Sequence, residues 1–303
     1  FRGGGIAIRH NSSPSFKNVL IHSNSATWGG GIIFLENTGA PFISNISVVK
    51  NNASNSGGGM AFDWGNPEIY NSILWGNTAV DKGNQVYLHV NNADPDFYYC
   101  DIEGDTSAFG YGTGVDYSGF YLNNLNIDPV FNDIVYNDYR LKPGSPCINA
   151  GTPDTNGLAL PVTDLYGNTR IANRIVDIGC YETEYAELRS KVMLQGAYAG
   201  SKSMNTWLVQ QNLLPNNQPY NNTVHAYPGS ESLQTLAANM VDWVLVELRD
   251  QADPSTLRGV RAGILLSDGV IVDTSLSTYL AFDTLYPGEF YVVMKHRNHL
   301  PVM

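Results

Sequence analysis

The residues whose types could support chemistry gather in one acidic stretch of the chain. Asp101, Glu103 and Asp105 stand at every second position, and Asp94 and Asp96 come shortly before them. On a β-strand, side chains two residues apart point to the same face of the sheet. Carboxylate oxygens are the ligands that Ca²⁺ prefers, and paired carboxylates also carry out glycoside hydrolysis. The three alternating residues are therefore candidates for a calcium site or a catalytic site.

A catalytic site of this kind also needs a basic group or a second set of acids nearby. The basic side chains of the preceding segments do not occupy equivalent positions close to the acidic stretch: Arg9, Lys17, Lys50 and Lys82. We therefore expect a solvated acidic face first, with a calcium site and a catalytic site as the alternatives. His296 and His299 are three residues apart, which sends their rings to opposite faces of a strand, so we expect no metal site there.

The elements that must position these residues come from a sequence repeat. Three copies begin with a triple glycine, and a proline follows each one. Four residues after each proline stands a first asparagine, six residues later a second, and two residues later an alanine. The first asparagines are Asn18, Asn45 and Asn71, and the second asparagines are Asn24, Asn51 and Asn77. This regular spacing indicates a repeat architecture.

The period and the residue types predict a right-handed parallel β-helix over residues 1–184. Each copy of about 26 residues contains short runs of strand-forming residues separated by Gly, Asn and Pro, with no helical periodicity. Each strand would pair with its equivalent one coil along, so that equivalent residues stack. Asparagines at coil corners can adopt left-handed backbone angles and bond to the amides above and below. We therefore expect both asparagine columns to be structural.

The second half of the chain predicts a different all-β domain. Residues 183–189 change in composition, and residues 188–303 contain strand-forming runs between Pro, Gly and Asn turns. This spacing is typical of an antiparallel β-sandwich. In the run 241–248, Trp243 and Leu245 would face one side of the strand, and Val244 and Val246 the other, with both sides buried.

Bulk properties exclude some partners. The 303 residues carry a net charge of −11 and only 15% charged residues, which makes nucleic acid an unexpected partner. No apolar run reaches the roughly 20 residues that a membrane-spanning helix needs. The chain begins inside a repeat copy, so we expect the natural protein to extend further toward its N-terminus.

An ordered series of motifs resembles a known family. These motifs lie at residues 71–77, 101–104, 128–131, 138–141, 145–151 and 176–182. They resemble right-handed parallel β-helix proteins whose helix ends in a choice-of-anchor module, which are secreted or cell-surface proteins frequent in Bacteroidota. Cys180 departs from the small residue expected there. The second domain resembles an accessory domain of large secreted Bacteroidota proteins, in which a type IX secretion sorting domain often follows.

The resemblance carries several expectations about individual residues. The segment 164–182 would form a cap that closes the last coil, with Arg170 or Arg174 paired to Asp177. Cys147 and Cys180 both lie in this cap and could form a disulfide in an oxidising exterior, which would leave Cys100 as a buried free thiol.

One short motif suggests a modification. Asp283, Thr284 and Leu285 are similar to the acidic-hydroxyl-apolar signal for O-glycosylation in Bacteroidota, beside a turn expected to be exposed. Thr284 would then be the modified residue.

Two classes of function remain open from the sequence. The first is a non-catalytic section of a large secreted or cell-surface protein, acting as an adhesin, stalk or display element, without a cofactor, and binding glycans or other surface proteins. The second is a β-helix carbohydrate-active enzyme, a polysaccharide lyase or glycosidase, with calcium as its cofactor. Activity lost on replacing Asp101 and Glu103 would discriminate between them.

Overall fold

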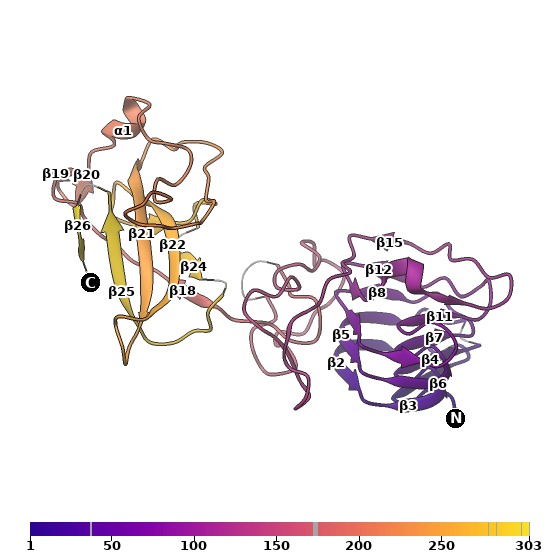
Figure 1. Ribbon diagram of the computed structural model, residues 1–303. Coiled ribbons are helices and arrows are strands. Elements are labelled where there is room, and N and C mark those ends of the chain that lie inside the picture. Colours follow the sequence, from indigo (N-terminus) through magenta and orange to yellow (C-terminus); the bar gives the residue numbers. More distant parts are fainter. Residues whose placement is uncertain (37, 172–174, 278, 283, 298, 303) are drawn as a thin grey trace. The chain divides into compact units, whose positions relative to one another are not determined.

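The structure of the chain is a computed structural model that describes residues 1–302 apart from 37, 172–174, 278, 283 and 298. The chain divides into two compact units, Phe1–Thr183 and Glu184–Met303. We call them unit 1 and unit 2, and each is described by itself. Both units are built almost entirely from β-strands (Figure 1). The all-β fold class predicted from the sequence, a solenoid of parallel strands followed by an antiparallel unit, is confirmed.

Unit 1 is a solenoid whose successive coils contribute parallel strands to three sheets. The first sheet is β1 (Ile6–Arg9), β4 (Ile32–Leu35), β7 (Met60–Phe62), β11 (Val86–Leu88) and β14 (Gly110–Tyr111). The second contains β2 (Ser15–His22), β5 (Phe42–Val49), β8 (Glu68–Tyr70), β9 (Ile73–Trp75), β12 (Asp96–Tyr98), β13 (Asp101–Ile102) and β15 (Tyr121–Leu122). The third is β3 (Ser25–Trp28), β6 (Asn52–Ser56) and β10 (Thr78–Ala79).

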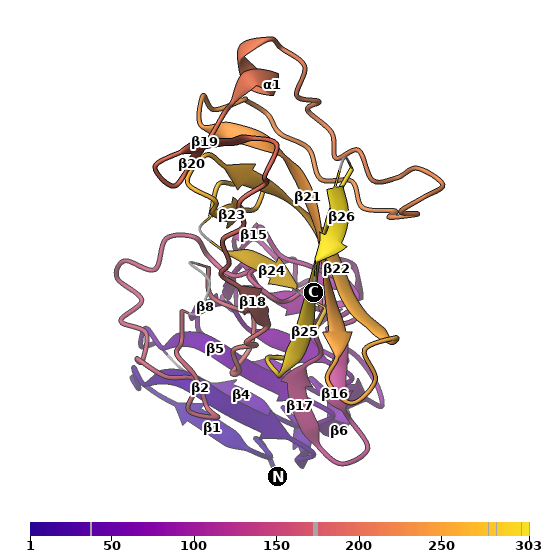
Figure 2. The same cartoon turned by 90° about the vertical axis from the view of Figure 1, so that its left-hand side faces the viewer.

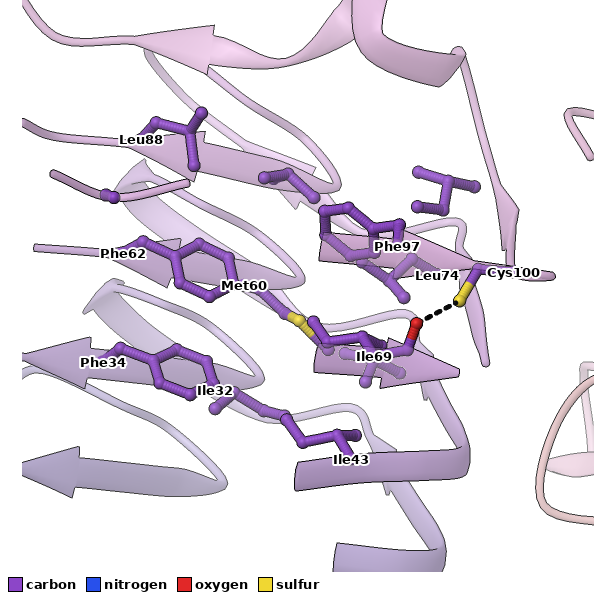
Figure 3. Packing of buried hydrophobic residues seen from close by; sticks show 14 of the residues in the cluster. Ile32, Phe34, Ile43, Met60, Phe62, Ile69, Leu74, Leu88, Phe97 and Cys100 are labelled. Carbon is purple, nitrogen blue, oxygen red and sulfur yellow. Dashed lines mark hydrogen bonds between the residues drawn. The ribbon is translucent and has the colours of Figure 1, made fainter. Parts of the chain in front are cut away.

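The strand register follows the repeat period. Ile32 pairs with Met60 and Met60 with Val86, so each step along the first sheet is one repeat copy. Inward-facing residues of successive coils form columns in the core, such as Phe34, Phe62 and Leu88 on one wall and Ile43, Ile69 and Phe97 on another (Figure 3). The Phe34 and Phe62 rings stack with centroids 4.5 Å apart. Burial of these columns is the main stabilising term of the unit.

The triple glycines are required by the tight spacing of the coils. A Cβ on Gly30 would lie 2.5 Å from the carbonyl oxygen of Gly58, and one on Gly58 would lie 2.5 Å from that of Asn84. These separations are far below any normal contact, so a side chain would push neighbouring coils apart. Only glycine fits at this corner.

The second asparagine column forms a continuous ladder inside the solenoid. The Asn51 Oδ1 accepts hydrogen bonds from the backbone N and the Nδ2 of Asn24, both at 3.0 Å. The Asn77 Oδ1 in turn accepts from the backbone N and Nδ2 of Asn51, at 2.8 and 3.0 Å. The Asn77 Nδ2 donates to the Gln85 Oε1 at 2.6 Å, and the Gln85 Nε2 to the Glu103 Oε2 at 2.7 Å. Each side chain therefore connects one coil to the next.

The first asparagine column marks a corner where the backbone turns with positive φ. Asn18, Asn45 and Asn71 have φ of 53°, 50° and 48°, and Tyr99 occupies the same place one coil further with φ 52°. Asparagine tolerates this conformation better than most residues. Within the column, Asn71 Nδ2 lies 3.5 Å from Asn45 Oδ1, but most partners of these side chains come from another part of the chain.

Those partners belong to the end of unit 1, which lies along the side of the solenoid. After the hairpin β16 (Phe131–Asp133) and β17 (Asp138–Leu141), residues 142–171 and 175–183 form what we call the strap (Figure 1). Asn71 Oδ1 accepts from Thr152 N at 2.8 Å, Asn45 Nδ2 donates to Asp177 O at 3.2 Å, and Asn18 Nδ2 donates to Thr163 O at 2.6 Å. The expectation of a cap over the last coil is therefore wrong: the strap spans several coils because their outward corners offer it hydrogen bonds.

Two further expectations about this segment need correction. Arg170, which is 1% exposed, forms an ion pair with Glu182, with 3.4 Å between Nε and Oε1, and donates to Gly179 O. The predicted partner Asp177 instead accepts from the backbone N of Asn149 and Thr183. Arg174 lies outside the described residues.

The predicted Cys147–Cys180 disulfide is also wrong. Cys147 and Cys180 are buried free thiols in the described part of the chain, as is Cys100. The two residues have different hydrogen-bond partners. The Cys147 thiol donates to Asp101 Oδ2 at 3.1 Å, and the Cys180 backbone N donates to Ser47 Oγ at 3.2 Å.

Unit 2 is organised around a curled antiparallel sheet with the strand order β23, β22, β21, β25, β26 (Figure 2). These strands are β21 (Met240–Asp250), β22 (Leu257–Leu266), β23 (Ile271–Val272), β25 (Phe290–His296) and β26 (His299–Val302). Smaller elements are β18 (Ala186–Leu188) with β24 (Leu280–Phe282), β19 (Tyr198–Gly200) with β20 (Ser203–Met204), and α1 (Trp207–Gln210).

The central strand β21 separates two apolar clusters. Trp243 and Leu245 pack into one cluster, and Val244 and Val246 into the other. All four side chains are at most 1% exposed. Both faces of this strand are therefore buried, as its unbroken apolar run predicts.

Candidate functional site

The three alternating carboxylates of the acidic stretch do not share a face. Strand β13 ends at Ile102, and Gly104 (φ 80°) then turns the chain into the short 3-10 helix Asp105–Ala108. Because the extended conformation stops before Glu103, the alternation expected from the spacing is lost. The prediction of one acidic strand face is therefore wrong.

Asp101 points into the protein. Its side chain accepts from Cys147 Sγ at 3.1 Å and from Ile127 N at 3.2 Å, and the residue is 0% exposed. Burial raises the pKa of Asp101 to about 6, although its hydrogen bonds oppose the shift. Asp101 therefore joins the strap to the fourth coil and cannot meet a substrate in this arrangement.

The other acidic residues are bound to neighbouring coils or to their own turn. Glu103 Oε2 accepts from Gly76 N at 2.8 Å and from Gln85 Nε2, which ends the asparagine ladder. Asp105 accepts from Ser107 N at 2.7 Å, and this bond lowers its pKa. Asp94 and Asp96 accept from Ser118 N and Phe120 N. Among the described residues, no group of three or more His, Cys, Asp or Glu side chains could hold a metal ion.

A different set of residues forms a candidate site on the outside of the first sheet. Along each strand of this sheet, inward residues alternate with outward ones, so Ile33, Ala61 and Tyr87 stack on the outward side of the sheet, where they form a small buried cluster of their own. Asp63 and His89 directly follow strands β7 and β11, and Trp28 ends strand β3. Arg2 forms an isolated bridge with Trp28. We call Arg2, Trp28, Asp63, Tyr87 and His89 the outer-face cluster.

Three aromatic rings form the centre of the outer-face cluster. The centroids of Trp28 and Tyr87 are 5.4 Å apart, and the ring of His89 meets Trp28 edge-on at 5.8 Å. The Tyr87 hydroxyl lies 3.3 Å from His89 Nδ1. Ala61 is the small residue between Ile33 and Tyr87 in the outward column, and a shallow hollow of about 30 Å³ lies in this region.

Charged groups surround the rings and remain in reach of solvent. Asp63 lies between two bases, with Oδ2 3.4 Å from Arg2 Nη1 and Oδ1 3.7 Å from His89 Nε2. The side chains of Arg2, His89 and Asp63 are 54%, 48% and 25% exposed. Burial, with smaller contributions from Asp81 and Asp63, raises the pKa of Tyr87, so its hydroxyl keeps its proton at neutral pH. The cluster thus offers flat apolar rings beside accessible donors and acceptors.

A second row of surface aromatics has another role. The rings of Phe42, Tyr70, Tyr98 and Phe120 contact one another in sequence over four coils. Tyr70 and Tyr98 are paired in register, and their centroids are 4.7 Å apart with the rings nearly parallel. Their ring faces cover one another, which stabilises the stacking of the coils. Burial, followed by the nearby Asp96, raises the pKa of Tyr98 to about 12.

The remaining predicted positions lie apart from the outer-face cluster. Thr284 is exposed in the turn after β24, while its neighbour Asp283 lies outside the described residues. His296 is buried and bonds to Asp242, and nothing is described for the side chain of His299.

The sequence did contain a signal for the outer-face cluster. Around each triple glycine most positions repeat, but the residue just before it changes from Arg2 to Trp28 to Ser56 to Lys82. The position after the inward Phe34, Phe62 and Leu88 changes in the same way, from Leu35 to Asp63 to His89. Stacking of the coils requires the positions that are the same in every repeat copy. The positions that differ between copies are free of this requirement and can therefore form a ligand site.

Comparisons with known proteins leave the family open: no family model, no curated protein and no solved structure matches the chain. None of the helices in the described part is long and apolar enough to span a membrane.

Proposed function

We propose that this chain is a non-catalytic section of a larger secreted or cell-surface protein, in which the solenoid displays a glycan-binding face. The outer-face cluster is the observation that carries the proposal, because it joins aromatic rings to a partly exposed carboxylate and to the exposed side chains of Arg2 and His89. A sugar ring presents C–H groups on its faces and hydroxyls at its edge. The C–H face of the sugar would contact the Trp28 ring, and the hydroxyls would form hydrogen bonds with Asp63, Arg2 and His89.

The dimensions of the cluster favour an extended glycan. Its hollow of about 30 Å³ has space for a water-sized group and not for a sugar ring. A ligand would therefore lie across the surface. The members come from four successive coils, which are spaced by about 4.8 Å, so the cluster extends over roughly 10–15 Å. A chain of several sugar residues would fit this length better than a single one.

The display role is supported by how the repeat residues are used. The asparagine ladder, the glycine corners and the strap contacts all serve the stacking of coils. Asp101 and Glu103, the first candidates for catalysis, are held in such structural bonds. Secretion, a choice-of-anchor type strap and a Bacteroidota context belong to this proposal on the strength of the sequence motifs at residues 145–151 and 176–182.

A glycan array with the purified chain tests the proposal. We expect binding to one or a few polysaccharide classes, and a loss of about tenfold or more in affinity for Trp28→Ala and for His89→Ala. Tyr136→Ala is the matched control, because Tyr136 is an exposed aromatic of the same unit, 83% exposed on the β16–β17 turn. Binding that survives both cluster variants, or no binding to any glycan, would refute this function for the cluster.

A further inference from the structure

Unit 2 contains a cavity that the proposed function does not use. Its volume is about 270 Å³, and its apolar walls include Leu194, Leu208 and Val241. Asn205, Trp207, Asp242 and His296 supply its polar and aromatic lining. Small-molecule sites usually begin at about 300 Å³, so this cavity has room for one small ring and little more. We call it the unit 2 pocket.

A charged network forms one side of the unit 2 pocket. Asp242, at the start of β21, is 2% exposed, and His296, at the end of β25, is 8% exposed. The two are 3.0 Å apart between His296 Nε2 and Asp242 Oδ2. Arg297 binds the same carboxylate through Nε at 3.1 Å and Nη2 at 2.9 Å, and Trp243 N donates to Oδ1 at 2.8 Å.

This network fixes the polar side of the pocket and balances its charge. Both oxygens of Asp242 are occupied by donors, so the carboxylate cannot turn toward a ligand. The bidentate contact with Arg297 offsets its negative charge. Among the described residues that line the pocket there is no Lys or Arg to attract an anion, and the chain as a whole carries −11. A neutral ligand with hydrogen-bonding groups therefore suits the site better than a charged one.

Trp207 gives the other side of the pocket an apolar, aromatic surface. It begins α1 and is 70% exposed although it lines the pocket, whereas the next residue, Leu208, packs against the core of the unit. An exposed indole beside a cavity is a large apolar surface that a ring can cover. Asn205, just before the helix, has an amide that can both donate and accept.

We propose that the unit 2 pocket binds one terminal residue of a neutral saccharide, stacked on Trp207 and hydrogen-bonded by Asn205. A purely apolar ligand that covered the Asn205 amide would leave this group without a partner, which costs free energy. A planar aromatic ligand would use Trp207 but not the donors and acceptors around it. A cyclic polyol uses both, and its size matches the space.

The test uses the full chain and a panel of methyl glycosides of neutral sugars, with methyl glucuronide as the charged probe. Saturation-transfer NMR detects contact, and titration of tryptophan fluorescence gives affinity. We expect at least one neutral glycoside to bind, and Trp207→Ala to weaken it by about tenfold or more. Asn205→Ala should also weaken it, by a smaller factor.

Controls separate this pocket from the outer-face cluster. Trp64→Ala removes another exposed tryptophan, 40% exposed in unit 1, and should leave glycoside binding unchanged. Trp28→Ala should weaken binding of long glycans by the solenoid by about tenfold or more but should not change binding of the single sugar. Glycoside binding that persists in Trp207→Ala, that is lost in Trp28→Ala, or that occurs only with the glucuronide would overturn the proposal, as would no binding at all.

Discussion

Replacement of Asn51 by alanine tests the asparagine ladder most sharply. Asn51 is 0% exposed, and its amide makes hydrogen bonds in both directions along the solenoid. Its Nδ2 donates to Ile21 O, Val49 O and Asn77 Oδ1 at 2.9, 3.2 and 3.0 Å, and its Oδ1 accepts twice from Asn24. Alanine would remove all five contacts and leave their partners buried.

The expected loss follows from those partners. Asn77 Oδ1 keeps one bond, from the backbone N of residue 51, and Asn24 Nδ2 keeps its bond to His22 O, whereas the backbone N of Asn24 loses its acceptor. One polar group left without a partner costs about 1–3 kcal/mol, and the four other lost hydrogen bonds cost roughly 0.5 kcal/mol each, so the expected loss is about 3–5 kcal/mol. Asn24→Ala is the matched control. It removes the half-buried end of the ladder and should cost about 1 kcal/mol, because Asn51 Oδ1 keeps the Asn24 backbone N as a donor.

Urea unfolding of the full chain, followed by circular dichroism and by hydrogen exchange of unit 1 amides, measures both variants. The exchange data are needed because a two-unit chain need not unfold in one step. The amides of unit 2 serve as an internal reference that should not change. A loss below about 1 kcal/mol for Asn51→Ala, or a loss no larger than that of Asn24→Ala, would refute the structural role of the ladder.

Other predictions address the core, the strap and the buried acid. Trp243→Ala should destabilise unit 2 by about 3–5 kcal/mol through a cavity at a fully buried position; a change below about 0.5 kcal/mol in urea unfolding would contradict its burial. Asn45→Ala should make the strap far more sensitive to limited proteolysis, since it removes the bonds to Asp177 O and Gly179 O, and an unchanged digestion pattern would argue against this anchoring. Asp101 has a raised folded pKa of about 6, so the stability it contributes is fully present below its unfolded pKa and is lost as pH rises through 6. The stability of the wild type relative to Asp101→Asn should thus fall by about 2.5 kcal/mol between pH 4 and pH 8, whereas a flat difference would show that the carboxyl is not buried in this way. Maleimide labelling in denaturant without reductant should modify three thiols. Labelling of a single thiol would show instead that Cys147 and Cys180 form a disulfide.

The repeat made the solenoid predictable because stacking imposes the same demand on every coil. Glycine where a Cβ would strike the next coil, and asparagine where the backbone has positive φ, recur for physical reasons that a single sequence reveals. The same regularity explains why the sequence predicts the strands of unit 1 better than those of unit 2. In unit 2 the apolar run at 241–248 predicts the buried strand β21, but no repeated pattern indicates the small elements around it.

The strap was misread because its partners are far away in the sequence. Asn18 bonds to Thr163, and Asp101 accepts from Cys147, across separations that no local pattern encodes. The acidic stretch was misread for a local reason, since a single left-handed glycine at 104 ended the strand on which the alternation depended. The outer-face cluster was missed because its members are scattered over four coils and become neighbours only through the register of the sheets.

In the function that we propose, this chain binds glycans at the outer-face cluster without cleaving them. The most direct measurement incubates the chain with immobilised and soluble polysaccharides, and quantifies retained protein together with released reducing ends and unsaturated products. We expect retention that falls about tenfold or more in Trp28→Ala, with no soluble products from the wild type. Depolymerisation by the wild type that disappears when Asp101→Asn and Glu103→Gln are combined would contradict it.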